Sequence, residues 1–248
     1  QVRPAGGWGY GPGHRTTQKH PARTDTSNTS WALRALEAAD QAGARVIVSV
    51  RRDARRYWRR IQNDDGGWGY EPNVGSVAPF RPESYGSMTA VGTAALARLL
   101  RRASDDNPAA RAGGARAVAR GLTWLDGHFA LDQNPAWAWG TPRTYLYTYY
   151  LGLLDTAGET GRQRLGRADL ARRIAGSLLA RQRPDGSWHD PANADGGDAP
   201  VRTCLALLTL LRARRPVPVA ALRPDDVAGD PAAMANLADW LSGRLGRA

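Results

Sequence analysis

Two kinds of hydrophobic pattern alternate along the chain. In the first, small and apolar residues cover nearly the whole circumference of a helix, as at 27–36, 87–96, 145–154 and 201–210. In the second, arginines lie on one face and large apolar side chains on the other, as at about 47–62, 109–127, 167–182 and 232–245. A helix of the second kind is expected to cover one of the first. Since no segment alternates like a half-buried strand, the pattern predicts an all-α chain of alternating inner and outer helices.

A short turn motif comes before each inner helix. Its copies are Gln62–Trp68, Gln182–Trp188, the longer Gln1–Trp8 and a degraded Leu131–Trp137 that lacks the glycine. The helices that follow align at Thr29, Thr89 and Thr203. Repeats of this kind are single supersecondary units that bury their apolar faces against their neighbours. Because the inner helices are apolar on both flanks, we expect the hairpins to form a ring, which buries both flanks.

The turns and the helices after them together resemble a known family. Gln-x-x-x-Gly-x-x-Trp-like turns followed by Asp/Ser-x-Thr-x-x-Ala-Leu-x-Ala-Leu helices are similar to the QW repeats of squalene-hopene cyclases and protein prenyltransferase β subunits. The resemblance extends from Gln1 to about residue 213. It implies an α/α toroid of about four helical hairpins, with the Gln–Trp pairs in a structural role. We expect a single α/α-toroid domain over 1–248, either closed by the helix at 232–245 or part of a larger toroid.

The resemblance also allows a test for the acid chemistry of the cyclases. These enzymes protonate an alkene with an Asp-x-Asp-Asp-Thr motif, and the matching stretch here is Asp25–Thr29. Ser27 stands where the resemblance places the proton donor, and a serine hydroxyl cannot protonate an alkene. The motif therefore argues against class II cyclisation. Asp25 and Asn28 stay weak catalytic candidates, or they cap the helix that follows.

The sequence also argues against the zinc chemistry of the prenyltransferases. Their His-Thr-Cys-like stretch matches Arg202-Thr203-Cys204, so that Arg202 stands where the resemblance places a histidine ligand. Arginine is not a zinc ligand. Cys204 is the single cysteine of the chain, which excludes an internal disulfide and a cysteine-rich zinc site. We expect no metal and no cofactor, and Arg202 is a third weak catalytic candidate.

Aromatic residues gather in the loops before the inner helices. In an α/α toroid these loops line the mouth of the central cavity, where aromatic rings suit an apolar ligand, a carbocation or a sugar. The alternative is that the rings pack the loops against the helices. The ligand-binding candidates are Trp8, Tyr10, Trp68, Tyr70, Trp137, Trp139, Tyr145, Tyr147 and Trp188.

Charge adds a hypothesis about partners. The chain has 34 Lys and Arg against 23 Asp and Glu, a formal net charge of +11. This charge favours anionic surfaces or partners, although arginines spread along helices are also typical of a solvated face. No nucleic-acid-binding motif accompanies them, and no apolar run is long enough to span a membrane. The chain begins at Gln1, so we expect a soluble protein, either cytoplasmic or exported after processing.

Three functions stay open at this point, and the sequence does not decide whether the chain is an enzyme. The first is a divergent terpene cyclase or prenyltransferase relative that binds or converts an isoprenoid or another apolar ligand. The second is a non-catalytic scaffold for protein interaction. The third is a carbohydrate-active α/α-toroid enzyme, in which Asp25, Asp64 or Asp65 would act as acid or base.

Overall fold

The structure is a computed structural model that describes residues 6–9, 24–71, 83–101, 108–162, 164–165, 168–188 and 199–213. The described residues belong to one compact unit, Gln1–Arg215. Its helices are α1 (Thr26–Gln41), α2 (Val48–Arg60), α3 (Gly86–Arg101), α4 (Pro108–His128), α5 (Leu146–Thr160), α6 (Leu170–Leu179) and α7 (Ala199–Ala213). The prediction of an all-α fold is confirmed for this part of the chain.

One small hairpin departs from the prediction of helices alone. Strands β1 (Arg164–Leu165) and β2 (Ala168–Asp169) pair antiparallel between α5 and α6. Strands of two residues are too short to show an alternating pattern in the sequence. The helix expected at 167–182 therefore begins later, because the Asp169 side chain accepts a hydrogen bond from the backbone N–H of Arg172 at 3.2 Å and caps α6.

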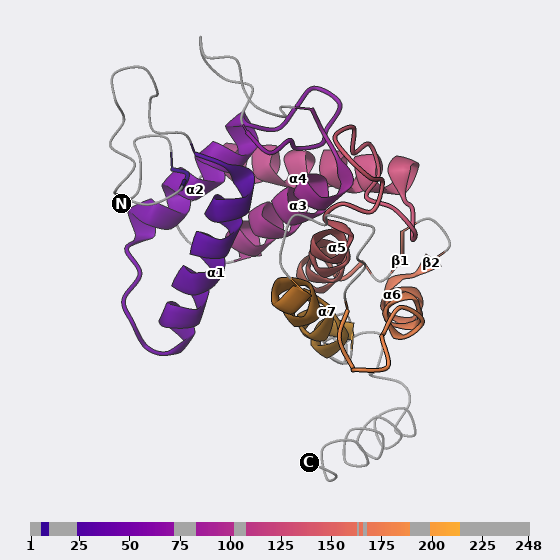
Figure 1. Ribbon diagram of the computed structural model, residues 1–248. Coiled ribbons are helices and arrows are strands. Elements are labelled where there is room, and N and C mark those ends of the chain that lie inside the picture. The colour runs from indigo at the N-terminus through magenta and orange to yellow at the C-terminus, as the bar shows by residue number, and fades with distance from the viewer. Residues whose placement is uncertain are drawn as a thin grey trace, which may run out of the picture. The chain divides into compact units, whose positions relative to one another are not determined.

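The inner helices pack in chain order and the outer helices cover them. Helix α3 contacts α1 and α5, and α5 in turn contacts α7. Outer helices α2 and α4 both lie on α3, while α6 lies against α5 and α7. Figure 1 shows α3 and α5 in the middle of this set. Every residue of α3 from Gly86 to Leu99 is buried, as expected for a helix that is apolar or small all round.

Two hydrophobic clusters make up the core of the described residues. The first surrounds α2 and α3 and includes Trp58, Trp68 and Leu96. The second surrounds α5 and α6 and includes Tyr149 and Ile174. Each cluster contains one tryptophan of a well-preserved repeat turn, since Trp188 belongs to the second. The turns therefore anchor the helices to the core.

The glutamine of each preserved turn closes the turn on itself. The Nε2 of Gln62 donates to the carbonyl oxygen of Gly66 at 2.8 Å, and the Nε2 of Gln182 donates to that of Gly186 at 3.0 Å. Both glycines have a positive φ, +92° and +81°, a conformation that costs glycine little. Two turns that lie 120 residues apart thus share one backbone geometry.

The tryptophan of each turn joins three segments. The Nε1 of Trp68 donates to the carbonyl oxygen of Trp58 at 3.0 Å, and that of Trp188 donates to Leu178 at 2.8 Å. These bonds tie each ring to the end of the outer helix before it. The backbone N–H groups of the turn tryptophans donate to the aligned threonines of the next inner helices, with N···Oγ1 distances of 2.9 Å for Trp8–Thr29, 3.1 Å for Trp68–Thr89 and 3.2 Å for Trp188–Thr203. The expected structural role of the motif is thus confirmed.

Candidate functional site

Asp25 caps α1. Its Oδ1 accepts the backbone N–H of Asn28 at 2.6 Å, and its Oδ2 accepts the side-chain amide of Asn28, also at 2.6 Å. The residue is only 4% exposed. Burial raises the pKa of the Asp25 carboxyl, and the hydrogen bonds from Asn28 oppose this rise. Both oxygens serve the cap, so the alternative that Asp25 and Asn28 form an N-cap pair is confirmed.

The rest of the Asp25–Thr29 stretch also has structural partners. The hydroxyl of Thr26 donates to the carbonyl oxygen of Gly69 at 2.9 Å. The Thr29 hydroxyl accepts the backbone N–H of Trp8. These contacts fasten the start of α1 to two repeat turns. The stretch Asp25–Thr29 therefore works here as a junction between repeats.

The aromatic candidates divide between the two hydrophobic clusters. Trp68 and Trp137 are buried in the first cluster, and Trp8, Tyr70, Trp139 and Tyr145 are half-buried against it. Tyr147 and Trp188 are buried in the second cluster. Tyr10 lies outside the described residues. These positions fit the packing alternative for Trp68, Trp137, Tyr147 and Trp188.

The degraded repeat brings several of these rings together. Trp137 meets Tyr85, Trp139 and Tyr145 edge-to-face, with ring centroids 5.0, 5.6 and 5.1 Å away. Two non-glycine residues of this loop have a positive φ, Ala136 at 58° and Tyr145 at 61°. A positive φ is strained for residues with a Cβ and persists only where the surroundings enforce it. The expectation that Tyr145 opens the helix is therefore corrected, since α5 begins at Leu146.

Asn134 holds the degraded repeat in place. Its Oδ1 accepts the backbone N–H of Ser87 at 2.7 Å, and its Nδ2 donates to the carbonyl oxygen of Thr144 at 3.0 Å. The side chain is buried and links the loop to the first turn of α3. The threonine of the other repeats is replaced here by Tyr147. In this copy, an asparagine of the loop thus links the loop to α3, the preceding inner helix, and to the segment just before α5.

Arg202 and Cys204 lie on different faces of α7. Arg202 is buried in the first turn of the helix, whereas the thiol of Cys204 belongs to an exposed residue. Within the described ranges, no three His, Cys, Asp or Glu side chains gather so that they could hold a metal ion. None of the helices described combines the length and apolar character that a membrane crossing requires.

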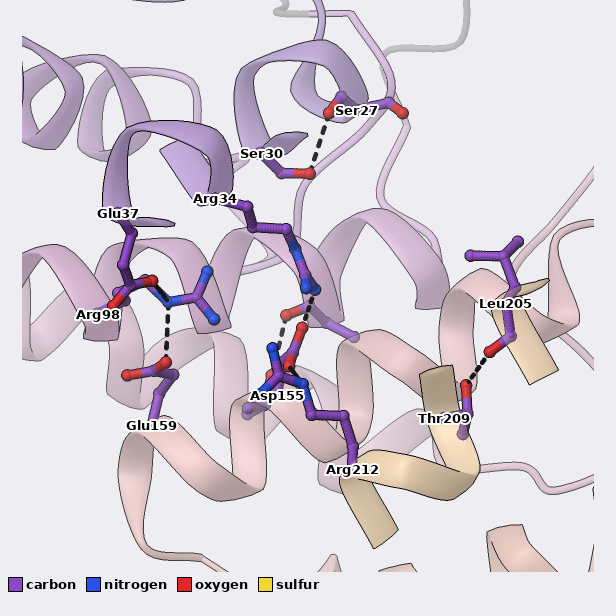
Figure 2. A network of polar contacts seen from close by, with 12 residues as sticks. Ser27, Ser30, Arg34, Glu37, Arg98, Asp155, Glu159, Leu205, Thr209 and Arg212 are labelled. Atoms are coloured by element: carbon purple, nitrogen blue, oxygen red, sulfur yellow. Dashed lines mark hydrogen bonds and ion pairs between the residues drawn. The ribbon is translucent and has the colours of Figure 1, made fainter. Parts of the chain in front are cut away.

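A network of charged side chains joins the inner helices of the described structure. Asp155 of α5 pairs with Arg34 of α1, and its Oδ1 lies 3.2 Å from the Nε of Arg212 of α7. Figure 2 shows both guanidinium groups pointing at this one carboxylate. The Asp155 side chain is 3% exposed. One buried carboxylate thus joins three helices.

The same network continues through α3. The Nε of Arg98 lies 2.9 Å from an oxygen of Glu37 of α1 and 2.8 Å from one of Glu159 of α5 (Figure 2). Glu159 also forms an ion pair with Arg101, with 2.5 Å between its Oε2 and the Nη2 of the arginine. Each of α1, α3, α5 and α7 therefore contributes at least one charge. We call Arg34, Glu37, Arg98, Asp155, Glu159 and Arg212 the inner network.

The charges of the inner network are packed closely enough to perturb one another. Burial, with the nearby guanidinium groups of Arg98 and Arg212, lowers the pKa of Arg34 to about 10. Arg34 stays protonated at neutral pH and also lies over the ring of Trp31, 5.1 Å from its centroid. The sequence carried one signal for this network: a few charged residues in otherwise apolar helices, such as Asp155 and Glu159 in α5. Their partners could be found only in the folded structure.

No family model matches the chain, and no curated protein matches it either.

Proposed function

We propose that this chain is a non-catalytic scaffold for protein interaction, built on a divergent repeat of the prenyltransferase/squalene-cyclase type. The observation that carries the proposal is the inner network. It places six charged side chains among α1, α3, α5 and α7, the helices that would surround the central cavity of a toroid. A hydrophobic substrate entering that space would have to displace paired charges, which is costly.

The contacts of the acids that were candidates for catalysis support the same proposal. Both carboxylate oxygens of Asp25 accept hydrogen bonds from Asn28 in the α1 cap. Asp65 accepts the Ser84 hydroxyl at 2.7 Å with one oxygen and the indole N–H of Trp124 at 3.0 Å with the other. A general acid or base must reach its substrate proton directly or through one water. Both carboxylates already hold structural groups, which argues against cyclase and polysaccharide-cleaving chemistry at these positions.

A second candidate function, binding of an apolar ligand, is favoured by the rings around Trp137. Trp139 and Tyr145 are half-buried and stand edge-on to Trp137, so they keep some surface available. The positive φ of Ala136 and Tyr145 lies in the same loop. Strained backbone often accompanies ligand sites. This second candidate is binding alone, without conversion of the ligand.

The experiment that tests the proposal is an assay for turnover and binding on the full chain. Squalene and farnesyl diphosphate are incubated with the protein, products are analysed by gas chromatography and mass spectrometry, and binding is followed by calorimetry. We expect no product with either substrate. Product that disappears in Asp25→Asn would show acid catalysis and refute the proposal. Tight binding without product, lost in Trp139→Ala, would favour the second candidate.

A further inference from the structure

The loop between α1 and α2 ends in two exposed aliphatic side chains. Ile47 and Val48, where α2 begins, are 67% and 50% exposed, and the loop residues from Ala42 to Arg45 are all exposed. A Cβ added at Gly43 would have no described atom within 4 Å. Figure 1 shows this loop standing away from α5 and α7. The tip of the α1–α2 hairpin is thus open to an external partner.

Ile47 breaks a local rule of helix formation. It occupies the N-cap of α2, where Ser, Thr, Asp and Asn are favoured and Ile is among the poorest residues. An aliphatic side chain cannot accept the hydrogen bonds of a cap. The hairpin is held instead by an ion pair between Arg51 and Asp40, at 2.7 Å. A residue that departs from local preference without a structural gain points to a function.

Most of the net charge of the chain lies directly behind this tip. Residues 42–60 contain seven arginines against one acid, Asp53, a net +6 of the total +11. Val48, Arg52 and Arg56 are spaced by four residues and therefore lie on one side of α2. Asp53 lies 3.7 and 3.6 Å from these two arginines, whose side chains stay 47% and 70% exposed. We give the name tip surface to Ile47, Val48 and the exposed arginines 45, 52, 56, 59 and 60.

The combination of aliphatic and cationic groups favours an anionic lipid bilayer as the partner. Aliphatic side chains gain by entering the boundary between headgroups and acyl chains, while arginines beside them meet anionic headgroups. Nucleic acid would use the arginines, but its bases stack on aromatic rings, and the aromatic residues of α2, Tyr57 and Trp58, are buried. A protein partner would have to supply both acids and an apolar pocket at matching positions.

The neighbouring parts of the chain are poorly suited to cover the tip surface. The loop and α2 lie within the described range 24–71. The segments on either side of that range that lie outside the described residues, 10–23 and 72–82, contain no Asp or Glu. Neither could neutralise the arginines, and 10–23 adds positive charge of its own. Charge complementarity therefore calls for an anionic partner from outside these segments.

From these features we infer that the tip surface binds anionic lipid membranes reversibly. Ile47 and Val48 enter the headgroup region, and the exposed arginines contact the anionic headgroups. The apolar face of α2 is buried in the core, as at Ala54 and Trp58, so α2 lies on the bilayer and does not enter it. Each arginine near such a surface strengthens binding about fivefold. The inference goes beyond the proposed function and holds whether or not the chain is catalytic.

The first test is co-sedimentation of the full chain with lipid vesicles. We expect binding to mixed phosphatidylcholine and phosphatidylglycerol but not to phosphatidylcholine alone, and weaker binding as KCl screens the charges. The double variant Arg52→Glu/Arg56→Glu should weaken binding about twentyfold or more. Arg172→Glu/Arg173→Glu is the matched control, because both arginines are exposed on the outer helix α6. Absence of binding to the anionic vesicles, or an equal loss in the control, would overturn the inference.

The second test separates a bilayer from other anionic partners. Ile47→Ser/Val48→Ser should weaken vesicle binding about tenfold, because two aliphatic groups no longer leave water. Leu179→Ser is the control, since Leu179 is 60% exposed but belongs to α6. Circular dichroism confirms that the variants fold. Unchanged vesicle binding in Ile47→Ser/Val48→Ser would refute insertion of the tip. Equally tight binding to duplex DNA, unaffected by these two substitutions, would assign the arginines to nucleic acid and also overturn the inference.

Discussion

The carboxylate of Asp155 forms ion pairs with two guanidinium groups from different helices. Water reaches 3% of its side chain, whereas the side chains of Arg34 and Arg212 are 21% and 30% exposed. Replacing a buried ion pair by apolar groups can be neutral, but removing one partner leaves an uncompensated charge. The carboxylate is therefore the residue on which the network depends most.

Asp155→Asn should lower the free energy of unfolding by about 2–3 kcal/mol, somewhat less than for a fully buried pair because both arginines keep some contact with water. Asp53→Asn is the control: Asp53 also faces two arginines, Arg52 and Arg56, but at 3.7 and 3.6 Å and with a side chain 39% exposed. Exposed pairs contribute about 1 kcal/mol or less. Urea unfolding of both variants measures the difference, and equal losses would show that the inner network adds nothing.

Asp25 makes stability depend on pH. Burial raises its folded pKa above the ordinary 3.8, so the ionised carboxylate is less stable in the folded chain than in the unfolded one. Its contribution to stability therefore declines as pH rises from the unfolded through the folded pKa. Asn is an equally good cap without a charge. Asp25→Asn should match or exceed the wild type at neutral pH and lose that advantage as the pH falls through the raised folded pKa towards about 4.

Urea unfolding across that pH range measures the effect. Asp25→Ala is the control for the cap, because it loses the hydrogen bonds to Asn28 and should cost about 1 kcal/mol at neutral pH. If Asp25→Asn instead became less stable relative to the wild type as the pH rises, the ionised carboxylate would be favoured by the fold. Burial would then not be the dominant effect on its pKa.

At the scale of elements, glycines allow α3 and α4 to pack closely against the ring of Trp68, a repeat tryptophan. A Cβ at Gly92 of α3 would lie 2.6 Å from Cδ2 of Trp68, and one at Gly121 of α4 would lie 2.8 Å from its Cζ3. Real Cβ atoms do not approach so closely. The absence of a Cβ at Gly92 and Gly121 thus allows α3 and α4 to pack against Trp68 of the Gln62–Trp68 turn.

A pair of glycine substitutions should therefore have opposite signs. Within a helix, Gly→Ala usually stabilises by about 1 kcal/mol. Gly176→Ala in α6 should show that gain, because no atom lies within 4 Å of its added Cβ. Gly92→Ala should instead cost about 1–3 kcal/mol, the range for overpacking. Thermal unfolding of both variants tests this, and a gain at Gly92 would mean that Trp68 moves freely.

The elements could be predicted well because each depends on local pattern. The ranges expected for the outer helices at 47–62 and 109–127 differ from α2 and α4 by at most two residues. The predicted start of α6 was too early, because the local β1–β2 hairpin and the Asp169 cap replace the first residues of the expected helix. The expected helix at 232–245 lies outside the described residues.

At the scale of the molecule, the inner helices are joined by charges as well as by apolar contacts. Asp155 links α1, α5 and α7, and Arg98 links α1, α3 and α5. The sequence shows each charged residue but not its partners, because Arg34 and Asp155 are 121 residues apart. The aromatic candidates, by contrast, could be found from the sequence, because they lie in turns that repeat along the chain and each turn is a local pattern. Which rings are buried depends on helix packing.

The balance between this network and the net charge predicts how salt acts on stability. A charge of +11 makes the compact state repel itself, and salt screens exposed charges over about 10 Å at 0.1 M. The inner network is largely shielded from water and is screened much less. Raising KCl from about 10 to 150 mM should therefore increase the free energy of unfolding, and Asp155→Asn should respond to the same degree. Calorimetry of both proteins at each concentration checks this. If salt destabilised the wild type but not Asp155→Asn, attraction within the network would outweigh the repulsion between surface arginines.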